Sequence, residues 1–333
     1  MGASLRLGKI FGIPIEIHFT WILIFGLITY LMADMFGRTQ PFWPETQRWI
    51  AAVVTSVLFF MSVLAHELTH SVVAERWGIP VRKITLFIFG GVSQLAHEAG
   101  RPLVEFTIAL IGPLSSAILS GIFAGLWFLV RDSHSAFSAV VFILAWVNLS
   151  LAVFNMLPGF PLDGGRVLRS AVWGLTGNYW RATQLAASLG QLLGAVMIAG
   201  GILLVVFTGQ IERAWMVLIG AFLLSAATSA YRQERENEKL KGYSVGQVMA
   251  ARWTSLTAPG PSEEYGLEAY HLSVAPHIVP EDTASHALEQ MENLGVPRLP
   301  VIQNGMVVGI IGRDQIGQLL GRKRSRRFFW TRK

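Results

Sequence analysis

Six long apolar runs constrain this chain more than any other feature of its sequence. They cover about residues 17–35, 50–73, 103–130, 136–157, 185–207 and 214–231. Each run is long enough to cross a hydrocarbon layer of roughly 30 Å as a helix. Charged residues make up 14% of the 333 residues, against about 25% in soluble domains. We therefore expect an α-helical polytopic membrane protein with about six transmembrane helices, and not a soluble globular enzyme.

The Lys and Arg residues between the runs predict the orientation. Thirteen of them lie at the N-terminus, in the second-to-third and fourth-to-fifth connections, and after the sixth run. The opposite side carries only Arg38, Arg48, Arg131 and Arg213. Because short cytoplasmic loops are enriched in Lys and Arg, we expect a multi-pass protein of the cell membrane with both termini in the cytoplasm.

The net charge of +6 comes from a basic aromatic tail at residues 321–333. That tail holds seven of the 27 Lys and Arg residues and no acid, and without it 20 basic residues face 21 acidic ones. It also contains Phe328, Phe329 and Trp330. Beside an apolar protein, such a segment indicates anionic lipid as its partner and not nucleic acid. A solvated tail without a partner is the alternative.

Two connections have the pattern of β-strands. Residues 5–18 and 81–96 are rich in β-branched residues and partly alternating, and Gly90 and Gly91 punctuate the second segment. Because open strand edges cannot face lipid, we expect membrane-associated strands that line a cavity or lie at the interface.

Glycine spacing inside the apolar runs predicts where helices approach closely. A small residue at every fourth position lets two helix backbones pack tightly. Two such pairs occur, Gly121 with Gly125 and Gly190 with Gly194.

The composition changes after residue 231. We interpret residues 1–231 as the membrane domain, residues 232–243 as a charged linker and residues 244–320 as a small α/β domain. Inside the last, residues 279–302 predict a strand, a helix with Thr283 near its start, a turn and a strand. A further strand and helix are predicted for residues 305–320, whereas residues 252–272 fit neither pattern and are expected to form a loop.

The sequence HELTH in the second run carries the clearest indication of chemistry. His66 and His70 share one face of a helix, with Glu67 beside them. Two such imidazoles can bind one zinc ion, and the HExxH pattern uses its Glu as general base for the metal-bound water. Ionisable residues in a span are costly unless they face each other or a polar cavity. This cost favours a functional site over a His pair that is merely hydrogen-bonded within the bundle.

A catalytic zinc ion needs a third protein ligand and an open position. The chain contains no cysteine, so that ligand must be His, Asp or Glu. The fourth run ends in FNMLPGFPLDGGRVLR, whose prolines and glycines break the helix near Asp163. We predict Asp163 as the third ligand. The alternative is an Asp in a turn, paired with Arg166.

Two asparagines near the same end of the fourth run are candidates for positioning a substrate. Asn148 and Asn155 are seven residues apart, about two helical turns on one face. Either could orient the scissile peptide or stabilise its oxyanion. An interhelical hydrogen bond is at least as good an interpretation for Asn148, so Asn155, closer to the break, is the better candidate.

Taken together, these motifs resemble the site-2 protease family of intramembrane zinc metalloproteases, in the branch with a C-terminal CBS (cystathionine-β-synthase type) domain. The resemblance covers most of the chain and rests on GIPIEIHFTW, HELTHSVVAERWGIPV, LFIFGGVSQL, GPLSS and FNMLPGFPLDGGRVLR. It implies one Zn²⁺ per chain on His66, His70 and Asp163, with Glu67 as catalytic base and Asn155 near the substrate. It also implies regulated intramembrane proteolysis, in which a partly unwound transmembrane helix of a single-span membrane protein is cleaved.

Two residues depart from the family pattern. Thr69 stands where the family usually has a small residue such as Gly, and Ser116 stands where many members have Asn. Neither change removes a ligand or the base. The change at Ser116 puts in doubt the polar contact that analogy would place there.

Residues 244–320 resemble a CBS module through SVGQVM, VPEDTASHALEQM, GVPRLPVI and MVVGIIGRDQI. Such modules normally bind adenine nucleotides as tandem pairs, and only one convincing copy is present, so a partner chain would have to complete the cleft. The ribose-contacting acid of the family maps to Asp314, but Gly312 replaces the usual hydroxyl residue two positions earlier. A homodimerisation or docking domain is the alternative to a nucleotide site.

A CBS-regulated ion transporter or channel is the rival interpretation of the whole chain. CBS modules also occur on ion transport proteins, and intramembrane His and Asp groups can relay ions. Transport needs polar residues along a path through both leaflets, whereas the fifth and sixth runs contain no Asp, Glu, Lys, Arg or His. The combination of HELTH with LDGG therefore favours the protease.

Overall fold

The computed structural model describes residues 4–133, 135–210, 213–253, 278–304 and 306–320. The chain divides into two compact units, Met1–Ala230 and Tyr231–Lys333. The first unit contains the membrane helices and the HELTH sequence, and the second contains a small α/β domain.

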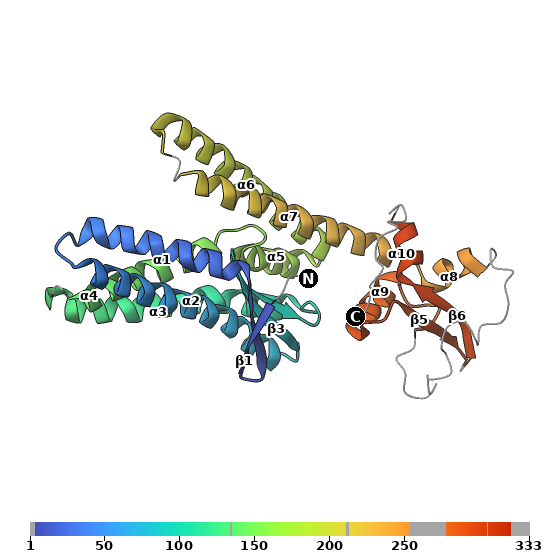
Figure 1. Cartoon of the computed structure of the whole chain (residues 1–333). Coiled ribbons are helices and arrows are strands. Elements are labelled where there is room, and N and C mark those ends of the chain that lie inside the picture. The colour runs from blue at the N-terminus through green and yellow to red at the C-terminus, as the bar shows by residue number, and fades with distance from the viewer. Residues whose placement is uncertain (1–3, 134, 211–212, 254–277, 305, 321–333) are drawn as a thin grey trace. The chain divides into compact units, whose positions relative to one another are not determined.

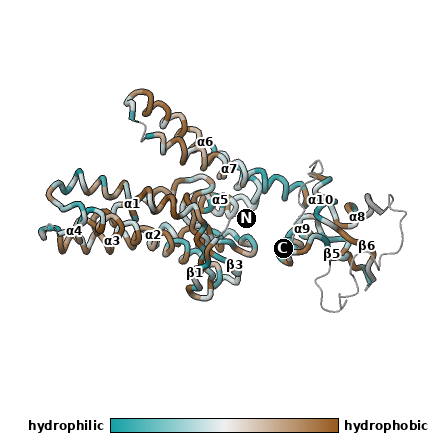
Figure 2. The backbone as a smooth tube through the Cα atoms, viewed as in Figure 1, coloured by the Kyte–Doolittle hydropathy of each residue, from teal (hydrophilic) through white to brown (hydrophobic). Residues whose placement is uncertain are grey.

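Within the described residues, six helices are long and apolar enough to cross a membrane. They are α1 (Thr20–Thr39), α2 (Glu45–Arg76), α3 (Pro102–Val130), α4 (Ala136–Asn155), α6 (Tyr179–Thr208) and α7 (Ala214–Lys241) (Figure 1). Each contains all or most of one apolar run, so the predicted six-span architecture is confirmed. Figure 2 shows hydrophobic residues along these helices and hydrophilic residues at the C-terminal end of α7, because the charged residues 232–241 continue that helix.

Helices α1 to α4 pack as a bundle (Figure 1). Phe36 of α1, Ala52 of α2 and Leu144 of α4 belong to one buried cluster that joins three of these helices. Large apolar side chains such as Leu129 and Val53 are exposed on the outer surfaces. Such surfaces suit a bilayer, where a helix satisfies its own backbone hydrogen bonds and presents apolar side chains to lipid.

Four strands form one sheet in the order β1-β2-β3-β4. They are β1 (Ser4–Ile10), β2 (Ile13–His18), β3 (Val81–Phe87) and β4 (Gly90–Leu95). β1 with β2 and β3 with β4 are antiparallel hairpins, and β2 pairs in parallel with β3. The two predicted strand segments are therefore confirmed. Apolar residues of the sheet pack with residues of α2 and α3, among them Ile15, Ile84, Ala74 and Ile108.

A buried carboxylate ties the two hairpins together. Glu16 of β2 accepts hydrogen bonds from Lys83 Nζ on β3 at 2.7 Å and from Ser4 Oγ on β1 at 2.8 Å. The Lys83 ammonium and the Ser4 hydroxyl lower the pKa of Glu16 to about 2, because both stabilise its charged form. These contacts join β1, β2 and β3 within the sheet.

The chain after the fourth span turns before it enters another helix. Residues 156–162 are non-helical, and α5 (Asp163–Thr176) begins at Asp163. The predicted helix break is confirmed, whereas the helix that follows it was not predicted. Gly190 of α6 packs directly on this turn, because a Cβ there would lie 2.0 Å from the carbonyl oxygen of Phe160.

Close helix packing is confirmed at Gly194, one of the four glycines in the two pairs. A Cβ on Gly194 of α6 would lie 2.8 Å from the carbonyl oxygen of Gly220 on α7. The same prediction is wrong for Gly121 and Gly125, where an added Cβ would meet no atom of a neighbouring element within 4 Å among the described residues. Those glycines lie on a surface of α3 that no described helix covers.

The second unit has its own core. It contains α8 (Val245–Trp253), α9 (Ala284–Leu294), the antiparallel pair β5 (Arg298–Gln303) and β6 (Met306–Gly312), and α10 (Arg313–Leu319). Thr283 accepts a hydrogen bond from the His286 N–H and caps α9, as the sequence predicts. Val245, Met291, Val301 and Ile311 are among the buried core residues. The expected loop at 252–272 lies almost wholly outside the described residues, as does the basic tail after residue 320.

Candidate metal centre and active site

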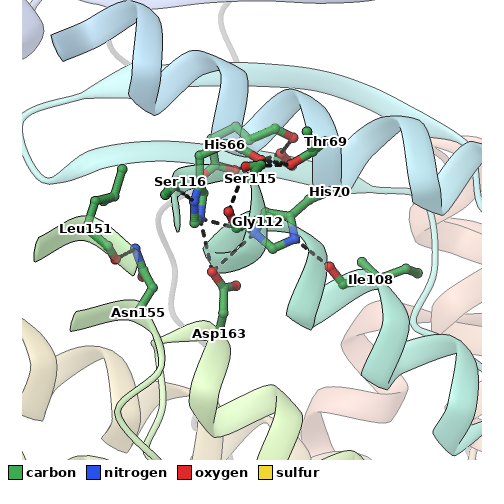
Figure 3. A network of polar contacts seen from close by, with 12 residues as sticks. His66, Thr69, His70, Ile108, Gly112, Ser115, Ser116, Leu151, Asn155 and Asp163 are labelled. Carbon is green, nitrogen blue, oxygen red and sulfur yellow. Dashed lines mark hydrogen bonds and ion pairs between the residues drawn. The ribbon is translucent and has the colours of Figure 1, made fainter. Parts of the chain in front are cut away.

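His66, His70 and Asp163 meet in one cluster between α2 and the start of α5 (Figure 3). Asp163 Oδ2 lies 3.1 Å from His66 Nε2 and 3.1 Å from His70 Nε2, and the two Nε2 atoms are 3.2 Å apart. Tetrahedral ligands at about 2.0–2.1 Å from a zinc ion are separated by about 3.3 Å. Both imidazoles are buried. The spacing and the donor set fit one zinc ion.

The outer nitrogens of both imidazoles have partners that turn the Nε2 atoms toward Asp163. His70 Nδ1 donates to the Ile108 carbonyl oxygen at 2.5 Å, and His66 Nδ1 lies 2.9 Å from Ser116 Oγ. A neutral imidazole that donates through Nδ1 presents a lone pair at Nε2. Lone pairs that face a carboxylate repel it unless a cation lies between them, and outer contacts of this kind orient histidine ligands in metal sites.

Asp163 reaches the histidines because the chain turns immediately before it. Leu162 is the extended N-cap residue of α5, so the side chain of Asp163 projects from the first turn of that helix. The Asp163 carboxylate is thus the oxygen donor of the cluster, and a carboxyl group binds a metal ion in its ionised form.

Gly112 of α3 makes room for the cluster. A Cβ at this position would lie 2.0 Å from His70 Nε2 and 2.8 Å from His66 Nε2. Every other residue type would therefore displace both imidazoles. Gly112 belongs to no spaced pair of glycines, so its role was not predicted from the sequence.

Glu67 lies beside the cluster and contacts the sheet. Its Oε2 accepts a hydrogen bond from Ser93 Oγ of β4 at 2.8 Å. A Cβ on Gly91 of the same strand would lie 2.5 Å from Glu67 Cγ. Neither Ser93 nor Gly91 was predicted as a site residue, although both lie in a segment that was predicted as a strand.

Ser116, at which the sequence departs from the family pattern, makes a polar contact within the site. Ser116 is buried, and its hydroxyl makes the contact with His66 Nδ1. Thr69 Oγ1 donates to the His66 carbonyl oxygen at 2.7 Å and lies 3.3 Å from Ser115 Oγ on α3, so its hydroxyl is accommodated between the two helices.

The two predicted asparagines differ in their surroundings. Asn148 is fully buried in α4 and donates to Ser62 Oγ on α2 at 3.2 Å, which is the interhelical contact considered as its alternative. Asn155 is half-buried at the end of α4 and donates to the Leu151 carbonyl oxygen at 3.1 Å (Figure 3). The Asn148 bond therefore joins two helices, whereas the Asn155 bond stays within α4.

Asp314 belongs to the second unit. It lies in the first turn of α10, two residues after Gly312, which is the N-cap residue of that helix. A side chain added at Gly312 would begin 2.5 Å from Asp314 Oδ1.

A buried ion pair that was not predicted from the sequence joins α3 and α5. Arg169 of α5 donates through Nε to Glu105 Oε1 of α3 at 2.7 Å, and its guanidinium lies 5.0 Å from the centre of the Phe160 ring. Glu105 is the only acidic residue in the third apolar run. The rule that ionisable residues in a span need a partner could have identified it.

Comparisons with known proteins agree with this geometry. Peptidase family M50 matches residues 54–133 and 131–200, and the CBS domain matches residues 273–319. The chain is 39% identical over 247 residues to sll0528 of Synechocystis sp., which is named as a candidate zinc metalloprotease, and the match covers 74% of this chain. It spans 64% of the length of that relative.

A sequence match and a structure match to one archaeon extend the comparison. Zinc metalloprotease MJ0392 of Methanocaldococcus jannaschii is 29% identical over 325 residues, which cover 98% of this chain and 83% of the relative. A solved structure of a site-2 protease from the same organism is 31% identical, with a TM-score of 0.50, and the match covers 69% of this chain and 95% of the solved chain. The sequence match, the shared fold and the His-His-Asp cluster together show that the chain belongs to the site-2 protease group of Peptidase family M50 and also carries a CBS domain.

Proposed function

We propose that the protein is an intramembrane zinc metalloendopeptidase that hydrolyses a peptide bond within a transmembrane segment of a membrane-tethered substrate. The observation that carries this proposal is the convergence of His66, His70 and Asp163 beside Glu67. The reported relatives give no support to the ion transporter or channel interpretation.

The three residues of the cluster and Glu67 have different roles in the proposed reaction. His66, His70 and Asp163 would hold one Zn²⁺, which supplies a Lewis acid that activates water and polarises the scissile carbonyl. Glu67 takes the proton of the attacking water and returns it to the nitrogen of the leaving amine as the peptide bond breaks. His70 and His66 are held in place by the Ile108 carbonyl and the Ser116 hydroxyl.

The substrate we propose is a single-span membrane protein whose helix unwinds locally. Asn155 is the better candidate for orienting the unwound segment, because it is half-buried and ends the helix that leads to Asp163. Asn148 would act less directly, by fixing α4 against α2 one helical turn before His66. An amide that donates to a carbonyl oxygen can hold a peptide or its oxyanion in place.

We further propose that the protein lies in the cell membrane with both termini in the cytoplasm, as the distribution of Lys and Arg predicts. The basic tail would bind anionic lipid. The single CBS domain would form a homodimer or a docking surface, and an adenine nucleotide at Asp314 would require the second module that such a dimer supplies.

The test of the protease is cleavage of a tagged single-span substrate by the purified protein in detergent with zinc. Wild type and Glu67→Gln are compared, with the zinc content of both measured. We expect product from wild type alone and equal zinc in both, because Glu67 is not one of the proposed ligands. Cleavage by Glu67→Gln at the wild-type rate would refute the role of Glu67, and absence of both product and zinc would refute the metalloprotease.

A further inference from the structure

We propose that Ser93 is a positioning residue for the catalytic base, holding the carboxylate of Glu67 through a hydrogen bond donated from strand β4. This inference rests on the proposed function, because it assigns Glu67 the role of base. It adds a residue from the sheet to a site otherwise built from helices α2, α3 and α5.

The alternation of side chains along β4 brings Ser93 to Glu67. Val92 and Gln94 are exposed, whereas Gly91, Ser93 and Leu95 are half-buried. Successive side chains of a strand point to opposite faces, so the half-buried set faces α2. Gly91 leaves the space through which the Glu67 side chain passes, since a Cβ there would lie 2.5 Å from Glu67 Cγ.

Ser93 contacts the carboxylate at the end of the Glu67 side chain. Its hydroxyl donates to Glu67 Oε2 at 2.8 Å. Ser71, one helical turn after Glu67, places its Oγ 3.1 Å from Ser93 Oγ and 2.9 Å from the Glu67 carbonyl oxygen. Ser71 is fully buried. The strand hydroxyl is thus held on one side by the helix and on the other by the carboxylate.

This hydrogen bond restricts the rotamers of the Glu67 side chain but leaves one carboxylate oxygen free to act as the base. A glutamate side chain has three rotatable bonds, and a base acts only when it lies within hydrogen-bond reach of the proton it removes. The Ser93 hydroxyl occupies Oε2, which leaves Oε1 to accept the proton of the attacking water. Loss of the hydroxyl would release the carboxylate into other rotamers and lower kcat, while the metal ligands and substrate contacts remain.

The chain offers a matched control in the same sheet. Thr85 of β3 pairs with Val92 of β4, and its Oγ1 is a buried hydroxyl without a hydrogen-bond partner among the described residues. Thr85→Val therefore removes a hydroxyl from the sheet without removing a hydrogen bond. Ser93→Thr keeps the hydroxyl at the position under test, on a strand where β-branched residues fit.

The first experiment measures kcat, KM and zinc content for wild type, Ser93→Ala, Ser93→Thr and Thr85→Val on the tagged single-span substrate. For Ser93→Ala we expect kcat to fall about 10-fold to 100-fold, an effect of the same size as that of removing a hydrogen-bond partner of a metal ligand. We expect KM and zinc content to stay at wild-type values, and the other two variants to keep most of the wild-type kcat. An unchanged kcat in Ser93→Ala, or a loss of zinc from it, would overturn the proposal.

A second measurement does not depend on activity. The infrared difference spectrum between zinc-loaded wild type and Glu67→Gln isolates the carboxylate stretching band of Glu67. The same difference is recorded in the Ser93→Ala background. We expect the band to shift when the hydrogen bond is removed, and an unshifted band would overturn the proposal even if the wild type cleaves no substrate. A shifted band in a wild type that does not cleave would instead count against the proposed function alone.

Discussion

At the residue scale, Gly112 gives the sharpest prediction for the metal centre. Ala in its place would put a methyl group 2.0 Å from His70 Nε2, so both imidazoles would have to move. We expect Gly112→Ala to lose most of the zinc that the wild type binds, as measured by metal analysis of purified protein. The change would otherwise favour the helix, because Ala has a higher helix propensity than Gly.

The control for this prediction lies on the same helix. A Cβ at Gly125 would meet no atom of a neighbouring element within 4 Å among the described residues, so Gly125→Ala makes the same substitution in open space. It should bind zinc as the wild type does. Wild-type zinc content in Gly112→Ala would contradict the prediction, because it would show that His66 and His70 can move and still bind zinc.

Also at the residue scale, the proposed ligands and base could be predicted from the sequence, but their supporting residues could not. The spacing within HELTH is enough to place both histidines on the same side, because residues four apart share a helix face. Ser93 and Gly112 act across elements, from a strand and from another helix. The residues next to them in the sequence do not indicate which side chain they contact. Their roles therefore become visible only in the packing of β4 and α3 against α2.

At the element scale, the Glu105 and Arg169 pair fixes α5 against α3. Both side chains are buried, and Arg169 lies six residues after Asp163 on the same helix. We expect Arg169→Met to destabilise the protein by about 3–5 kcal/mol, because it leaves a buried carboxylate without its partner. The free energy of unfolding of purified protein in mixed micelles, titrated with sodium dodecyl sulfate, measures this loss.

The double variant Glu105→Leu with Arg169→Met distinguishes the cost of an unpaired buried charge from the cost of lost packing contacts. Removing both partners abolishes the uncompensated charge, so this variant should recover most of the stability that Arg169→Met loses. Arg181→Met, at an exposed position of α6, serves as a control for the loss of one cation. Equal losses in the single and double variants would mean that Arg169 stabilises the fold through its contacts with Phe160 and Tyr179.

The same scale shows why some elements could be predicted and α5 could not. The apolar runs and the strands around Gly90 and Gly91 have strong periodic patterns, and the structure contains both. Helix α5 begins with Asp163, Gly164 and Gly165, and glycine disfavours helices. Those glycines are required by packing: a Cβ on Gly165 would lie 2.5 Å from the backbone of Gly159. Tertiary contacts therefore override local propensity in this segment.

At the scale of the whole molecule, the orientation in the membrane decides from which side water and product exchange with the site. His66 lies ten residues before the end of α2 at Arg76, about 15 Å along the helix. The sheet and α5 lie at that same end of the bundle (Figure 1). If the Lys and Arg distribution sets the topology, this end faces the cytoplasm and the cleavage product is released there.

The absence of cysteine makes this orientation directly measurable, because one introduced cysteine is the only thiol in the chain. We expect Arg38→Cys, in the last turn of α1, and Arg131→Cys, directly after α3, to react with a membrane-impermeant maleimide in intact cells, because both positions are exposed. Arg82→Cys, exposed on β3, should react only after permeabilisation. If Arg82→Cys were labelled in intact cells and the other two variants were not, the topology would be the opposite of the predicted one. The product would then be released on the side away from the cytoplasm.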